Sequence, residues 1–135
     1  MICNDNKAIA QADVLNGTLA QLPDKLKFYS ENAVVWDSVM RVAGYSETNQ
    51  AVGLEEIRKF YTWLSHLPPI KVELNSIFGE GDKVAVEWTL YGENAAGKFS
   101  IPCVNIYDFE DRKIMGVRMQ FDSAYFADII RRNTT

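Results

Sequence analysis

Hydrophobic residues recur at helical spacing in the first half of the chain. Residues 4–21 form one such pattern, with an apolar face made of Ile9, Ala12, Leu15 and Leu19. A second, shorter helix is expected over residues 23–30, because proline is tolerated in a first helical turn. A third begins at Gly53 and is ended by Pro68 and Pro69. Its apolar stripe consists of Leu54, Ile57, Tyr61 and Leu64.

Beyond residue 70 the hydrophobic period changes from helical to alternating. Turn signals at residues 79–82, 92–97 and 110–112 divide this part into four strands, over residues 70–78, 83–91, 98–109 and 113–122. Short connections between successive strands imply antiparallel pairing. A last helical stretch covers residues 124–131. Helices followed by an antiparallel meander predict an α+β fold, and we expect residues 1–135 to form a single domain.

One further strand, over residues 33–39, carries an unusual carboxylate. Alternation along this run points Asp37 inward together with Val35 and Val39. Burying an ionised carboxylate is costly unless it is paired or its pKa rises, so Asp37 is expected at a cavity or poised for proton transfer. A second interpretation remains open, in which Asp37 bonds the local backbone beside Ser38. Residues 40–52 lack a clear period, and we interpret them as a rim or lid loop.

The strand over residues 83–91 looks covered on both sides. One side consists of Val84, Val86, Trp88 and Leu90, and the other of Ala85, Glu87, Thr89 and Tyr91. Because the helices are too few to cover two faces, we expect a homodimer packed through the sheet on the first of these sets. The pattern also allows an arrangement in which Glu87 and Thr89 simply face water.

Composition excludes several classes of partner. The net charge is −4, and basic residues are scattered apart from Arg131 and Arg132, which argues against nucleic acid and anionic membranes. No apolar run approaches the length of a membrane span and no leader pattern is visible, so a cytoplasmic protein is expected. Cys3, Cys103 and the single His66 offer no metal-ligand spacing, and we expect neither metal nor other cofactor.

Three runs, residues 28–37, 52–61 and 114–122, resemble the nuclear transport factor 2-like superfamily, which includes ketosteroid isomerases and SnoaL-like polyketide cyclases. The resemblance implies a cone-shaped barrel, in which a strongly bent antiparallel sheet wraps around the N-terminal helices in a cystatin-like α+β roll. Asp37 matches the general base of the ketosteroid isomerases, and Asn105 stands where they carry a hydrogen-bond donor. Their second donor, a tyrosine on the first helix, has no counterpart here. SnoaL-like cyclases need only one acid or base in an apolar cavity.

The resemblance also implies an apolar cavity. Its expected wall consists of Leu15, Phe60, Tyr61, Leu64, Ala85, Thr89, Cys103, Tyr107, Val117, Met119 and Phe121. Asp37 is expected as base or acid, Asn105 as polarising donor and Glu87 as a second acid or base, although Asn105 could instead pin a bulge. Such a site suits an isomerase, cyclase or lyase acting on a hydrophobic polyketide, terpenoid or steroid-like molecule. The alternative is a protein of the same fold that binds a ligand or a protein without turnover.

Overall fold

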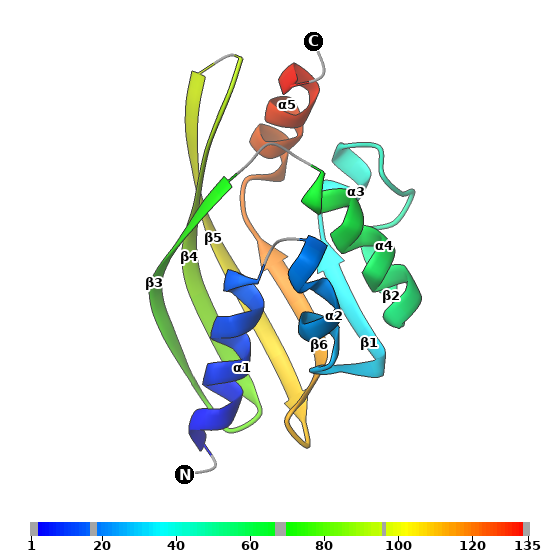
Figure 1. Cartoon of the computed structure of the whole chain (residues 1–135), viewed down its shortest axis with the longest axis vertical. Helices are drawn as coiled ribbons and strands as arrows, with labels where there is room; N and C mark the ends of the chain where they lie inside the picture. Colours follow the sequence, from blue (N-terminus) through cyan, green and yellow to red (C-terminus); the bar gives the residue numbers. More distant parts are fainter. Residues whose placement is uncertain (1–2, 17–18, 67–69, 96, 134–135) are drawn as a thin grey trace.

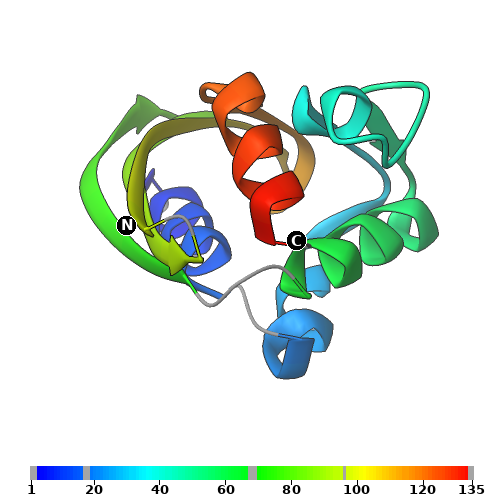
Figure 2. The same ribbon diagram turned by 90° about the horizontal axis from the view of Figure 1, so that it is seen from above.

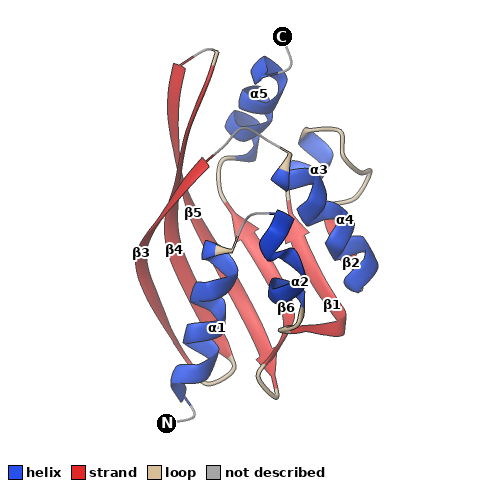
Figure 3. Ribbon diagram, viewed as in Figure 1, coloured by secondary structure: helices blue, strands red, loops and turns tan. Residues whose placement is uncertain are grey.

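A computed structural model describes residues 3–16, 19–66, 70–95 and 97–133 (Figures 1 and 3). The helices are α1 (Cys3–Leu15), η1 (Leu19–Gln21), α2 (Leu22–Leu26), α3 (Val39–Val42), α4 (Leu54–Ser65) and α5 (Ser123–Asn133). The strands are β1 (Tyr29–Asp37), β2 (Gln50–Val52), β3 (Ile70–Glu80), β4 (Lys83–Asn94), β5 (Gly97–Glu110) and β6 (Lys113–Gln120). The four-strand meander predicted for the second half is present; β3, β4 and β5 are longer than expected by up to three residues at an end, and β6 is two residues shorter.

All six strands form one strongly curved sheet in the order β2-β1-β6-β5-β4-β3. Successive strands from β3 to β6 pair antiparallel, as does β1 with β2. The β1 and β6 pair is parallel, which differs from the expected all-antiparallel sheet. The reason is that β1 precedes the meander and reaches its last strand through a long crossover, the type of connection that parallel pairs require. The sheet stays open rather than closing into a barrel, and the α+β class with a bent, cone-like sheet is confirmed.

Helices lie within the curve of the sheet, as Figure 2 shows from above. Helix α1 packs against β3 and β4, whereas α4 packs against β1 and β2. The C-terminal helix α5 lies between these two groups. Because the helices fill the concave side of the sheet, the hydrophobic core forms there. Its largest fully buried members include Phe60, Ile57, Ile101 and Tyr107.

The two sides of β4 face the opposite way from the one expected. Val84, Val86 and Leu90 are buried beneath the helices, and Trp88 lies on the same concave side. The prediction that this set packs between two subunits is therefore wrong. The more apolar side of the strand faces the core, as burial of apolar area favours.

The polar side of β4 lies on the outer face of the sheet. Glu87 is exposed and accepts a hydrogen bond from Ser76 Oγ on β3. Thr89 Oγ1 donates to Asn75 Oδ1 at 2.8 Å. The prediction that Ala85, Glu87 and Thr89 line a cavity is wrong, because this side of β4 faces away from the helices.

The first helix is shorter than expected and rotated about its axis. It ends at Leu15, which is 44% exposed, and its described buried face consists of Asn6, Ala10, Asp13 and Val14. Ile9 packs at the border of the core, as expected, but Leu15 does not, because Asn6 and Asp13 on the buried face shift the apparent apolar stripe away from its true centre.

Other boundaries shift for local reasons. The second helix ends at Leu26, and β1 already begins at Tyr29. The expected loop over residues 40–52 contains α3 and the short strand β2, which pairs with β1. The stop expected at Pro68 and Pro69 lies outside the described residues, and α4 ends at Ser65.

Two glycines at the β3–β4 turn test this geometry. Gly79 and Gly81 both have positive φ, but an added Cβ at Gly79 would lie 2.3 Å from Lys83 O, whereas at Gly81 nothing lies within 4 Å. Gly81→Ala should lower the free energy of unfolding by about 1 kcal/mol, from backbone strain alone. Gly79→Ala should lower it by about 3 kcal/mol or more, because the clash adds to the strain. Urea denaturation measures both; equal losses would contradict the packing around Gly79.

Candidate active site

A cavity of about 140 Å³ lies between the concave face of the sheet and the helices. Its apolar wall consists of Val14, Leu22, Leu64, Val72, Trp88, Leu90, Phe99, Ile101, Met119, Phe121, Phe126 and Ile129. Its polar or ionisable residues are Asp13, Asn16, Lys25, Asp37, Tyr61, Cys103 and Asn105. A mostly apolar wall with a few convergent polar groups is typical of a small-molecule site.

Asp37 ends β1 at this cavity and is only 2% exposed. Its Oδ1 accepts a hydrogen bond from the backbone N–H of Val39 at 2.9 Å, the single hydrogen bond to this carboxyl within the described part of the chain. Burial raises the pKa of Asp37 to about 7, while the Val39 hydrogen bond acts in the opposite direction. Both interpretations of this residue therefore coexist: Asp37 bonds the local backbone and also faces the cavity.

The Cys103 thiol lies close enough to Asp37 to feel its charge. Burial raises the pKa of Cys103 to about 12, and the negative charge of Asp37 adds to the effect. A thiol with this pKa stays neutral at physiological pH, so Cys103 acts as a small apolar wall residue.

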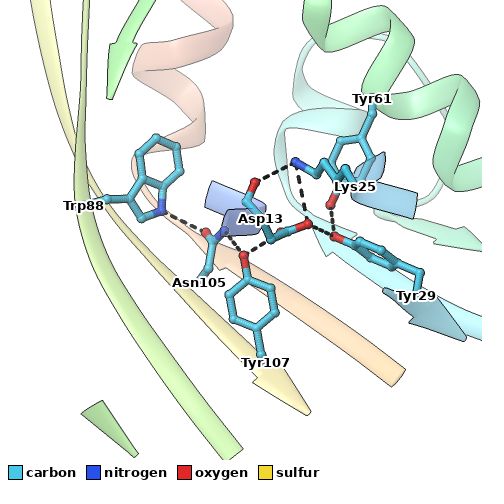
Figure 4. A network of polar contacts seen from close by, with 7 residues as sticks. All are labelled: Asp13, Lys25, Tyr29, Tyr61, Trp88, Asn105 and Tyr107. Carbon is cyan, nitrogen blue, oxygen red and sulfur yellow. Dashed lines mark hydrogen bonds and ion pairs between the residues drawn. The ribbon is translucent and has the colours of Figure 1, made fainter. Parts of the chain in front are cut away.

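A second polar cluster surrounds the buried carboxylate of Asp13 on α1 (Figure 4). Tyr29 OH lies 2.9 Å from its Oδ1, and Tyr107 OH lies 2.6 Å from its Oδ2, so each hydroxyl donates to the carboxylate. Tyr61 OH lies 2.6 Å from Tyr29 OH, and Lys25 Nζ lies 3.0 Å from the backbone oxygen of Asp13. Burial, followed by the charge of Asp13, raises the pKa of all three tyrosines well above the usual range. The hydroxyls therefore remain protonated, and those of Tyr29 and Tyr107 give their hydrogens to Asp13.

Asn105 extends this cluster along β5 toward β4. Its Nδ2 donates to Tyr107 OH at 3.2 Å, and its Oδ1 accepts from Trp88 Nε1 at 3.1 Å. The register shift between β5 and β6 lies at Asp108 and Phe109, so Asn105 does not pin that bulge. Among the described residues, Tyr107 OH is the one acceptor bonded to Nδ2, so the second hydrogen of the amide is left for a ligand.

The structure brings together about half of the residues predicted for this site. Those on the cavity wall are Asp37, Asn105, Tyr61, Leu64, Cys103, Met119 and Phe121. Tyr107 is buried behind Asn105, Val117 is in the core, and Phe60 packs on Tyr45, with ring centroids 5.5 Å apart. Leu15, Ala85, Glu87 and Thr89 lie away from the cavity, as the helix rotation and strand register require. The catalytic and binding roles remain predictions.

Sequence reasoning missed Asp13 and Lys25. Asp13 follows Ala10 and precedes Val14 on the buried face of α1, so it is a carboxylate on an apolar stripe, the same signal that identifies Asp37. The wrong helical phase concealed this signal. Lys25 gives no such signal, because a lysine in a short helix is usually solvated.

The described residues contain neither a metal-binding group nor a membrane-spanning helix. Within them, no three His, Cys, Asp or Glu side chains gather into a group that could hold a metal ion. None of the helices over those ranges combines the length and the apolar character needed to cross a membrane.

Comparison with known families identifies one match. The model of the SnoaL-like domain family matches residues 9–117, which is most of the chain. The comparison with curated proteins yields no significant relative.

Solved structures share the fold at low sequence identity. An NTF2-like protein of unknown function from Burkholderia pseudomallei is 16% identical with a TM-score of 0.80, over 93% of this chain and 97% of that one. A candidate SnoaL-like polyketide cyclase from Jannaschia is 16% identical with a TM-score of 0.79, over 96% and 93%. TerC, co-crystallized with polyporic acid, is 16% identical with a TM-score of 0.78, over 94% and 98%. At this identity the likeness establishes the fold alone.

The raised pKa of Asp37 predicts a pH-dependent stability. Its carboxyl takes up a proton near pH 7 when folded and near 3.8 when unfolded, a difference of roughly three units or about 4 kcal/mol. The stability that protonation contributes is fully present below pH 3.8 and is lost as pH rises through 7. Asp37→Asn, which keeps the shape, should match the wild type at pH 4 and exceed it by up to about 4 kcal/mol at pH 9. Urea denaturation at both pH values measures the difference; an equal gap at the two would contradict a buried, weakly acidic Asp37.

Proposed function

Because this chain belongs to the SnoaL-like domain family, we propose that it catalyses proton transfer on a small apolar carbonyl compound, as an isomerase, cyclase or dehydratase. Asp37 is the general base or acid. The observation that carries this proposal is the placement of one buried carboxyl, with a pKa of about 7, on the wall of an otherwise apolar cavity.

A pKa near the working pH suits proton transfer in both directions. At pH 7 a carboxyl with this pKa is present in similar amounts as carboxylate and as acid, so one side chain can take a proton from carbon and return it elsewhere. Exclusion of water strengthens the interaction of the carboxylate with an acidic C–H bond, because few competing dipoles surround it.

Asn105 is the proposed polarising donor for a substrate oxygen. Its position is fixed by Trp88 and Tyr107, so the free amide hydrogen is pre-organised and costs little to orient. Glu87 has no part in this proposal, because it lies on the outer face of the sheet.

The enclosed volume favours a substrate of about one ring. A cavity of about 140 Å³ is close to the roughly 150 Å³ of an engineered cavity that binds benzene. A compact polyketide or terpenoid fits this volume better than a four-ring steroid. Support from relatives is general: one structural neighbour is a candidate polyketide cyclase, and another holds polyporic acid.

Replacement of the acid–base group tests the mechanism. Asp37→Asn should reduce proton exchange at the α-carbon of cyclic enones in D₂O by about two to four orders of magnitude, followed by NMR, because the base is lost while shape is kept. In the wild type, exchange that requires the carboxylate should rise with pH and level off above about 7. Asn105→Ala should cost about two to three orders.

Thermal unfolding of both variants controls for folding. Exchange by Asp37→Asn at the wild-type rate would contradict the mechanism. Binding of the same compounds without any exchange would favour the alternative, a ligand-binding protein of this fold.

A homodimer packed through the outer face of the sheet is a separate proposal. Pairing places Phe78, Ala85, Ile106, Arg118 and Trp36 in one row across that face. Phe78 is 53% exposed, and most of the row is apolar. A second copy of the chain is the simplest cover for such a row, because a two-fold interface uses the same patch twice.

Ile106→Glu should convert a dimer into a monomer, since a charge would be desolvated at the centre of the interface. Lys59→Glu, an exposed substitution on α4, should leave the dimer intact. Sedimentation at micromolar concentration measures both. A monomeric wild type would remove the dimer proposal without affecting the cavity.

A further inference from the structure

A buried cation shares the cavity with Asp37. Lys25 lies on α2 with a side chain 9% exposed, and it is one of the residues that line the cavity. Taking an ammonium group out of water is costly unless its donors find partners. The partners of this group therefore determine what else it can bind.

The protein uses only part of the hydrogen-bonding capacity of Lys25. Nζ donates to the backbone oxygen of Asp13 at 3.0 Å, and it lies 4.1 Å from the centre of the Tyr61 ring, whose face attracts a cation. An ammonium group has three N–H donors. Among the described residues, the backbone oxygen of Asp13 is the one acceptor within hydrogen-bond distance of Nζ; even if a second N–H points at the Tyr61 ring, at least one N–H is left for a ligand.

The carboxylate of Asp13 does not take up that donor. The distance from Nζ to Oδ1 is 3.8 Å, which is an ion pair but too long for a hydrogen bond. Both carboxylate oxygens already accept from tyrosines, Oδ1 from Tyr29 and Oδ2 from Tyr107 (Figure 4). The tyrosines thus hold the carboxylate in place, and at least one N–H of Lys25 remains available to a ligand.

Tyr61 connects the cation to the acid–base group. Its ring lies beneath Lys25 Nζ, and its hydroxyl is close enough to Asp37 to feel that charge. Lys25 and Asp37 are therefore two polar points on the wall of one apolar cavity, with Tyr61 adjacent to both. A molecule that fills the cavity therefore lies against a wall that carries both groups.

From this arrangement we propose that Lys25 is a ligand-binding residue, which holds an anionic oxygen of a ring-sized apolar molecule in the cavity. The inference rests on the proposed function and specifies its substrate class: a carbonyl compound that becomes an enolate. When the C–H bond breaks, the proton goes to Asp37 and the electron pair moves onto the carbonyl oxygen. The charged N–H of Lys25 stabilises that oxygen, beside the neutral amide donor of Asn105.

The electrostatics of the cluster agree with this role. Burial lowers the pKa of Lys25, and the charge and hydrogen bonding of Asp13 raise it. The groups that face Nζ are Asp13 and Tyr61. The hydroxyl of Tyr29 bonds to both of them. An anionic oxygen adjacent to Nζ favours the charged form of the lysine further, so ligand binding and lysine protonation strengthen one another.

A matched pair of ligands separates charge from shape. Benzoate and benzamide have nearly the same size, but only benzoate carries an anionic oxygen. At pH 6, where Asp37 is mostly protonated, calorimetry should show the wild type binding benzoate about 10- to 100-fold more tightly than benzamide. Lys25→Met, which keeps the length of the side chain, should remove this preference and leave benzamide affinity within about threefold. Lys25→Arg, which keeps the charge, should retain part of the preference.

A readout on the wild type covers the case in which Lys25→Met does not fold. With lysines labelled at ¹³Cε and ¹⁵Nζ, benzoate should shift the Lys25 resonance, and benzamide should not. Equal affinity for the two ligands, or an unmoved Lys25 resonance at saturating benzoate, would overturn the proposal.

Asp37→Asn distinguishes this inference from the proposed function. That variant should lose proton exchange and keep the benzoate preference. If Lys25→Met loses the benzoate preference but keeps the wild-type exchange rate, Lys25 binds the anion, and its role in stabilising the enolate oxygen is overturned. Exchange without any benzoate preference in the wild type would refute Lys25 as an anion-binding residue while the role of Asp37 stands.

Discussion

One buried carboxylate holds the polar side of this molecule together. Asp13 on α1 accepts hydrogen bonds from Tyr29 on β1 and Tyr107 on β5, and it pairs with Lys25 on α2. Through Tyr29 the same cluster reaches Tyr61 on α4. Removing one partner of such a buried network typically costs about 3–5 kcal/mol, because the others are left unpaired. The position of the helices over the concave sheet, and hence the shape of the cavity, depends on this contact.

The apolar wall of that cavity sets the chemistry of its remaining carboxyl. Asp13 accepts hydrogen bonds from two tyrosines, whereas within the described residues Asp37 accepts one, from the backbone N–H of Val39, in a mostly apolar cavity. Two carboxyl groups of similar burial therefore stand in opposite environments. Burial destabilises the folded protein whenever Asp37 is ionised, and the same effect raises the pKa of its carboxyl to about 7. A core optimised only for stability would place an apolar side chain there.

Sequence patterns predicted the fold class, the four-strand meander and the inward direction of Asp37, because alternation and turn chemistry are local properties. They failed where the two sides of an element were hard to tell apart. On α1 the buried face contains Asn6 and Asp13, which masked its helical phase. On β4 the pattern predicted that the apolar side forms a subunit interface, whereas this side packs beneath the helices on the concave face. Besides each other, Asp13 and Lys25 have partners on three other elements, β1, β5 and α4, and no local pattern encodes such contacts.

If Asp37 transfers protons at neutral pH, it must be a buried carboxyl whose pKa lies near 7 in the folded protein. The most direct measurement is an NMR titration of its ¹³Cγ resonance in the wild-type protein, assigned by comparison with Asp37→Asn. We expect a midpoint near pH 7, because burial raises the pKa of Asp37 more than the Val39 hydrogen bond lowers it. A midpoint near 4, the value of a solvated aspartate, would contradict it.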